Sequence, residues 1–129
     1  MSQRAPDWLK QAQRDHEQAM ASRKDGRHEW ACFAAHQAAE KAVKALHLHL
    51  GQEAWGHVIA QLLVELPPSV QAPGDLVEQA RTLDTAYIPT RYPDSHPAGA
   101  PFEHYGPLQS QQAVEYAGQI LAFVRSSLA

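Results

Sequence analysis

The stretch that decides the fold is EWACFAAHQAAEKAVKAL, residues 29–46. It is rich in alanine, glutamate, lysine and leucine, which are strong helix formers. Gly51 follows, the residue type best suited to end a helix in the left-handed conformation. The apolar positions form more than one stripe, because Trp30 and Phe33 lie on a different side from most of the alanines. We therefore expect a central helix over 27–50 that is covered on more than one side, and whose alanines also allow contact with a second subunit.

Four further segments have apolar residues at helical spacing, and none alternates with a period of two. We therefore expect an all-α fold. The first helix should end near Gly26, a short helix should end at Pro67, and the next helix should have Asp75 as its cap. The apolar positions that mark these segments are Trp8, Leu9, Ala12, Ala19 and Met20; Val58, Ile59, Leu62, Leu63 and Leu66; Leu76, Ala80, Leu83 and Tyr87; and Val114, Ala117, Leu121, Val124 and Leu128.

Length and composition indicate one domain over residues 1–129 with a net charge of -3. The single cysteine excludes an internal disulfide, and no apolar run approaches the roughly 18 residues of a membrane helix, so we expect a cytoplasmic protein with no membrane contact. Residues 1–50 carry a net charge of +2 and residues 51–129 a net charge of -5. No polybasic tract exists, which argues against broad binding to duplex nucleic acid.

The connection over residues 88–107 holds five of the nine prolines together with several aromatic residues. Connections of this length are usually functional or disordered, and the proline and aromatic content favours partial order here. The stretch YIPTRYPDSH, residues 87–96, combines aromatic rings, a guanidinium and an imidazole. Such groups can stack on a base and pair with a phosphate, so we expect nucleotide binding through Tyr87, Arg91, Tyr92 and Asp94. The alternative is that Arg91 pairs with Asp94 while the tyrosines close the end of the bundle.

Residues 36–44 of the expected central helix carry charged and polar side chains that suggest further binding roles. Glu40 and Lys44 have the favourable spacing for an exposed ion pair, and Lys41 or Lys44 would also suit a phosphate. His36 and Glu40 share a helix face, but no metal signature accompanies them, so we expect no metal and no cofactor. We expect Cys32 to behave as a small hydrophobic residue.

Three stretches of the chain resemble the HEPN domain, in the branch found in prokaryotes and at the C-terminus of the large neuronal protein sacsin. They are DWLKQA at residues 7–12, the run over 29–46, and YIPTRYPD at residues 87–94. The resemblance implies an up-and-down bundle of four or five helices and a homodimer that binds a nucleotide of the ATP or GTP class. It also implies a partnership with a minimal nucleotidyltransferase, as in a toxin–antitoxin pair.

Many HEPN proteins are metal-independent RNases in which an arginine is followed, after four to six residues, by a histidine. Arg91 and His96 have that spacing, so the resemblance implies that Arg91 stabilises phosphate charge while His96 moves a proton during RNA cleavage. Pro93 and Pro97 flank this histidine, so we expect the segment to lie outside a regular helix. The third alternative is a non-catalytic protein-interaction module.

Overall fold

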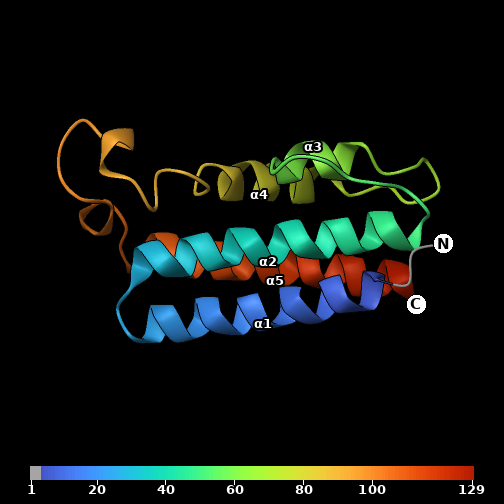
Figure 1. Ribbon diagram of the computed structural model, residues 1–129, viewed down its shortest axis with the longest axis horizontal. Helices are drawn as coiled ribbons and strands as arrows, with labels where there is room; N and C mark the ends of the chain where they lie inside the picture. The colour runs from blue at the N-terminus through green and yellow to red at the C-terminus, as the bar shows by residue number, and fades with distance from the viewer. Residues whose placement is uncertain (1–3) are drawn as a thin grey trace.

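The computed structural model of the protein describes residues 4–129, and that range contains no β-strand. These residues form five α-helices and two short 3-10 helices (Figure 1), as the all-α prediction requires. No helix in the described range is both long and apolar enough to cross a membrane. In chain order the elements are α1 (Ala5–Lys24), α2 (His28–His49), α3 (Ile59–Val64), α4 (Gly74–Asp84), η1 (Pro93–Ser95), η2 (Pro101–Glu103) and α5 (Pro107–Leu128).

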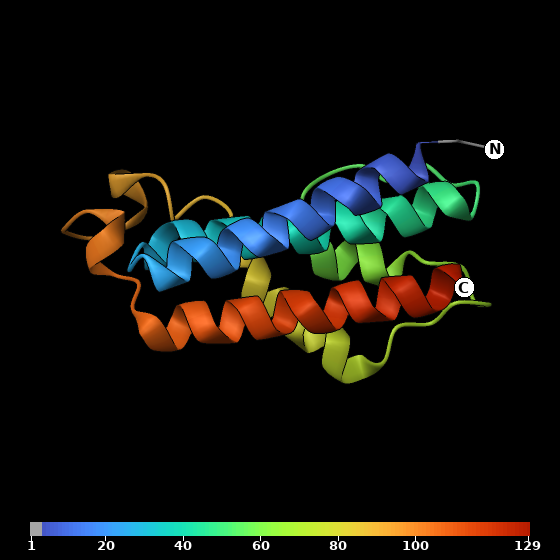
Figure 2. The same ribbon diagram turned by 90° about the horizontal axis from the view of Figure 1, so that it is seen from below.

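The helix α2 lies at the centre of the bundle and contacts α1, α3, α4 and α5. Figures 1 and 2 show α1 and α5 packed along one side of α2, with the shorter α3 and α4 on the other side. The chain direction of α1 is opposite to that of α2, whereas α5 runs in the same direction as α2 (Figure 2). The prediction of a central helix covered on more than one side is confirmed.

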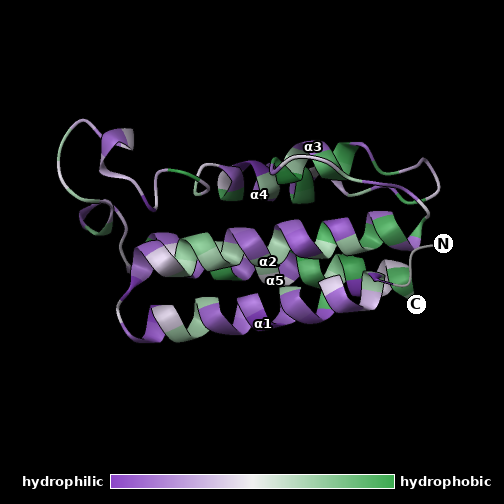
Figure 3. Ribbon diagram, viewed as in Figure 1, coloured by the Kyte–Doolittle hydropathy of each residue, from purple (hydrophilic) through white to green (hydrophobic). Residues whose placement is uncertain are grey.

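The alanines of α2 let neighbouring helices approach closely, since the distance between packed helices depends on the side chains at the contact. Ala35, Ala38 and Ala42 have no exposed surface, and Ala12 and Ala19 of α1 belong to the same core. The prediction that these alanines also form a subunit contact is therefore wrong, because they are buried inside one chain. Hydrophobic residues are correspondingly more frequent on α2 and α5 than on α1 (Figure 3).

The helix α4 differs from its prediction at both ends. It begins at Gly74 with Pro73 as its cap, two residues before the expected cap, and Asp75 lies in the first turn instead of capping it. It ends at Asp84, so Tyr87 lies beyond the helix. The helix cannot continue far, since Pro89 disfavours helical backbone at the preceding residue. Tyr87 thereby leaves the α4 face and becomes free to pack against α2.

The connection after α4 is ordered by short hydrogen-bonded turns, including η1 and η2, which confirms the expectation of partial order. His96 follows η1 with extended backbone angles, φ -123° and ψ 149°, so it lies outside a regular helix as predicted. Its ring stacks on that of His104, with ring centres 4.1 Å apart and planes 6° from parallel. The stacked rings therefore join the η1 turn to the η2 turn, since His96 directly follows η1 and His104 directly follows η2.

Candidate functional site

Arg91 is held against three aromatic rings. Its guanidinium carbon lies 4.4 Å from the ring centre of Phe33, 5.1 Å from that of Tyr87 and 5.2 Å from that of Tyr92. The side chain also donates to the main-chain carbonyl of Tyr87, from Nε at 3.0 Å and from Nη2 at 2.7 Å. Ring faces attract a cation, so these contacts fix the guanidinium in place. Among the described residues none accepts a hydrogen bond from Nη1, which remains able to bind an anion.

Asp94 does not pair with Arg91 anywhere in the described structure, so that part of the structural alternative is wrong. The reason is local: Pro93 places Asp94 in the η1 turn, while the arginine side chain folds back onto Tyr87. Tyr87 is half-buried, whereas the Tyr92 side chain is exposed. The aromatic cluster of Phe33, Tyr87, Arg91 and Tyr92 is therefore partly open to solvent.

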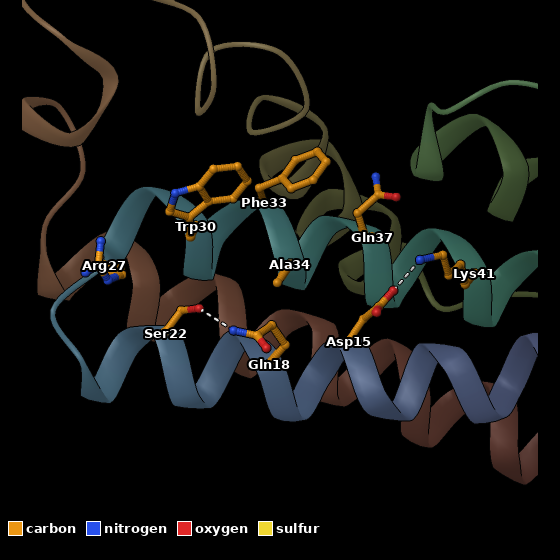
Figure 4. Close-up of a pocket in the computed structure, with 9 residues that line it drawn as sticks. All are labelled: Asp15, Gln18, Ser22, Arg27, Trp30, Phe33, Ala34, Gln37 and Lys41. Carbon is orange, nitrogen blue, oxygen red and sulfur yellow. Dashed lines mark hydrogen bonds and ion pairs between the residues drawn. The ribbon is translucent and has the colours of Figure 1, made fainter.

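A groove between α1 and α2 adjoins this aromatic cluster. Its volume is about 470 Å³, within the range typical of small-molecule sites. Figure 4 shows the Trp30 and Phe33 rings next to each other along one edge, and further along an ion pair from Lys41 of α2 to Asp15 of α1. Phe33 lines the groove and also contacts Arg91. The groove and the aromatic cluster are thus continuous through one ring, and Lys41 lies within reach of the same space.

Lys44 lies apart from this groove. Its Nζ is 3.2 Å from Oε2 of Glu40, and both side chains are largely shielded from solvent. The expected ion pair exists, but the prediction that it is exposed is wrong, because Glu40 occupies a buried position of the central helix. The structure therefore separates the expected nucleotide-binding residues. Tyr87, Arg91 and Tyr92 lie together, Lys41 lies along the adjoining groove, and Lys44 and Asp94 lie elsewhere.

The carboxylate of Glu40 is the centre of a polar network that the sequence did not reveal. His57 donates from Nδ1 to both carboxylate oxygens at 3.1 Å, and its ring stacks on Tyr87 at 4.8 Å. His36 lies 4.0 Å from Glu40 and 3.6 Å from Asp84. His57 comes from the irregular segment before α3, so helical spacing alone could not place it beside Glu40. One sequence feature pointed to buried polar groups. Since the apolar residues of α2 spread over more than one side, some of its polar side chains must lie in the interior.

Comparisons with known proteins agree with this architecture. The sequence pattern of the HEPN domain matches residues 5–127. The chain belongs to the HEPN domain family. Its fold resembles that of the crystal structure of TT1696 from Thermus thermophilus, with a TM-score of 0.96 and 54% identity, covering 98% of this chain and 100% of the other.

Two further solved structures, both described as HEPN proteins, are similar. ST0689, described as an archaeal HEPN homologue, has a TM-score of 0.85 and 39% identity, with 99% of this chain and 100% of that chain covered. An HEPN domain protein from Thermotoga maritima has a TM-score of 0.76 and 34% identity, with 93% and 95% covered. Among curated proteins, no sequence relative was found.

Arg91 and His96, the pair that the family resemblance predicts, make no contact with each other among the described residues of one chain. Nε2 of His96 donates to the carbonyl of Pro89 at 2.6 Å, and the ring packs between His104 and the edge of Tyr105. Arg91 points instead to Phe33 and Tyr87. Because Nε2 of His96 carries the hydrogen of that bond, Nδ1 is left as the acceptor nitrogen of the ring.

Cys32 has no catalytic setting in this HEPN fold. Its side chain is buried, and burial together with the nearby charge of Glu29 raises the pKa of the thiol to about 11. A thiol with so high a pKa carries little thiolate at neutral pH and is a poor nucleophile. Burial likewise raises the pKa of the neighbouring Tyr105 phenol.

The described residues include no group of three or more metal-ligating side chains.

Proposed function

We propose that this HEPN protein is a nucleotide-binding module that takes an ATP- or GTP-class ligand in the groove beside the aromatic cluster. The observation that carries the proposal is the Arg91 guanidinium, which is fixed against three rings with Nη1 still available, next to a groove of about 470 Å³. Arginine binds phosphate oxygens in a planar, multi-point geometry. A preoriented guanidinium of this kind loses little freedom when the ligand arrives.

The groove supplies the remaining contacts that such a ligand requires. Trp30 is 48% exposed and lies edge-on to Phe33 with 6.1 Å between ring centres, so a base can stack on the free indole face. Gln18 and Gln37 line the same groove and offer amide groups to a base or sugar. Lys41 adds positive charge that its ion pair with Asp15 partly neutralises. The phosphate would therefore lie toward Arg91.

The rim of the groove supports a homodimer as part of this proposal. Trp30 lines the groove and Tyr92 lies against Arg91 in the adjoining cluster, and each is 48% exposed. A second copy that covers these rings would remove apolar surface from water and close the nucleotide site. In the cell this module would act with a minimal nucleotidyltransferase partner, as in a toxin–antitoxin pair. A monomeric mass by light scattering at micromolar concentration, with and without ATP, would contradict the dimer.

The direct test is calorimetric titration of ATP and GTP into wild-type protein and two variants. Arg91→Lys keeps the charge but loses the planar fork, and we expect affinity to fall about tenfold, the equivalent of about 1.4 kcal/mol. Phe33→Leu removes the ring shared by groove and cluster and should weaken binding similarly. Arg81→Lys, at an exposed position of α4, is the matched control and should bind as wild type does. No heat with either nucleotide would overturn the proposal.

A second candidate function is metal-independent RNA cleavage by Arg91 and His96. The observation that favours it is the acceptor nitrogen Nδ1 of His96, which can take a proton from a 2′-hydroxyl. A time course with total tRNA in EDTA tests it, using wild type, Arg91→Ala and His96→Ala. Cleavage lost in both variants would assign the nuclease site. Intact RNA with all three proteins would exclude it, and a protein that also fails to bind nucleotide would be a non-catalytic interaction module.

A further inference from the structure

A second cavity lies at the end of the bundle where α1 begins and α2 ends, the end that carries the label N in Figure 1. Its volume is about 370 Å³, and it shares no lining residue with the groove beside Arg91. Residues from α1, α2 and the irregular segment before α3 surround it. The cavity is therefore a separate space, which the function proposed above does not use.

Two tryptophans form apolar walls of this cavity. Trp8 comes from α1 and Trp55 from the segment before α3, and the Trp55 side chain is 80% exposed. The two indoles make no ring contact with each other in the described structure, although both line the same space. Leu48 and Ala54 add further apolar surface. A large exposed indole beside a cavity is well suited to stacking on a flat ring.

The polar side of the cavity has a defined hydrogen-bonding pattern. Glu40 accepts from Nζ of Lys44 at 3.2 Å and from Nδ1 of His57 at 3.1 Å. Because a carboxylate only accepts, Nδ1 of His57 must carry the hydrogen, and Nε2 of the neutral ring is then an acceptor. No described residue bonds to that Nε2. Lys44 has three N–H groups and uses one on Glu40, so donors and an acceptor line the cavity together.

The side chains of Lys44 and His57 are held in place by contacts on the side away from the cavity. The Glu40 side chain is 6% exposed and that of Lys44 is 13% exposed. The His57 ring is stacked on Tyr87 with planes 20° from parallel, which sets its orientation independently of Glu40. Polar groups that are held in place before binding impose orientation on a ligand at low entropic cost.

We propose that this cavity binds the hydrogen-bonding edge of a nucleobase, or of a heterocycle with the same pattern, stacked on the tryptophan walls. The ring N–H of the ligand donates to Nε2 of His57, and the acceptor beside it receives an N–H from Lys44. A phosphate group is a poor occupant, since Glu40 already pairs with Lys44 and the Glu53 carboxylate also lines the cavity. The ligand class is therefore an uncharged base or nucleoside.

Guanosine, which carries no phosphate, is the probe for this site. Trp30→Phe protein retains Trp8 and Trp55 as its tryptophans, so its fluorescence reports on this end of the bundle, and Trp55 is the indole that lines this cavity without lining the neighbouring pocket beside Lys41. We expect saturable quenching by guanosine and at least tenfold weaker binding of purine riboside, which lacks an N–H on the same edge. Equal binding of the two nucleosides, or no saturable quenching by guanosine, would overturn the proposal.

Variants then locate the binding, measured by calorimetry in the Trp30→Phe background. Trp55→Ala and His57→Phe should each weaken guanosine binding at least tenfold, while Arg81→Lys, at an exposed position of α4 that lines neither cavity, should leave it unchanged. Trp55 is largely exposed, so its removal leaves the fold intact and the result remains interpretable. Guanosine binding that depends on Arg91 and not on Trp55 would contradict the proposal. Failure here would leave ATP binding at the groove untouched, because ATP is titrated separately against Arg91 variants.

Discussion

The guanidinium of Arg91 lies over the ring of Phe33 at 4.4 Å, and this contact joins the connection after α4 to the central helix. Two hydrogen bonds to the Tyr87 carbonyl hold the same guanidinium from the other side. The arginine therefore has a structural role and, through its free Nη1, a capacity to bind an anion. The two roles predict different measurements.

The structural role of Arg91 is tested by Arg91→Ala. Removal leaves the Tyr87 carbonyl without its two donors and removes three cation–π contacts, so we expect the free energy of unfolding to fall by about 1–3 kcal/mol. The measurement is the urea midpoint. Arg81→Ala, which disrupts only an exposed ion pair with Glu78, should change stability by less than about 0.5 kcal/mol. Equal effects of the two substitutions would show that the aromatic contacts contribute nothing.

The buried network is tested by Glu40→Gln. The substitution removes the negative charge that partners Lys44 and orients His57, and leaves a shielded ammonium without a counter-charge. Breaking one side of a buried ion pair costs about 3–5 kcal/mol. Glu78→Gln makes the same chemical change in an exposed pair and should cost less than about 0.5 kcal/mol. A loss at Glu40 no larger than that at Glu78 would mean that the network is not buried in solution.

Close packing around α2 is tested by Ala38→Leu. Ala38 has no exposed surface, so three added carbons must displace a neighbouring helix, at a cost of about 1–3 kcal/mol. Ala122→Leu places the same side chain on the exposed face of α5 and should be nearly neutral. Thermal unfolding followed by circular dichroism distinguishes them. If Ala38→Leu left stability intact and abolished dimerisation, the alanine face would be a subunit contact after all.

The raised pKa of Cys32 predicts that the thiol reacts slowly with a disulfide reagent and that the stability of the protein depends on pH. The pKa of the folded thiol is about 11 against an ordinary value of 9.0, so between these pH values the folded state binds more protons than the unfolded state. Stability therefore falls as pH rises through this window, by up to about 2–3 kcal/mol. Cys32→Ala should lose this dependence. Wild-type protein should also react with a disulfide reagent only after urea is added, and rapid reaction in buffer would contradict burial.

The long helices were predictable because each carries its own apolar spacing and its own end signals. Asp25–Gly26 ends α1, and Gly51, with a φ of 76°, lies just beyond α2. The C-terminal end of α4 was harder to predict, since Tyr87 fits the apolar spacing of that helix. Its ring packs on His57 and Phe33 instead, and contacts between segments far apart in the chain decide such an ending.

The candidate site was predictable only as residue types. The stretch around Arg91 indicated an aromatic and cationic cluster, and the structure confirms that Tyr87, Arg91 and Tyr92 lie together. The sequence could not show that Phe33 completes the cluster, or that Asp94 stays outside it. His57 was missed because it lies in an irregular segment 17 residues from Glu40, where no periodicity relates the two.

The central claim is that nucleotide binds in the groove between α1 and α2 next to Arg91. The most direct measurement is an amide chemical-shift titration of the labelled protein with ATP. We expect saturable shifts concentrated in residues 15–22, 27–41 and 87–92, and we expect Arg91→Lys to weaken the titration about tenfold. Shifts absent throughout, or confined to the Trp8 and Trp55 cavity, would contradict the claim.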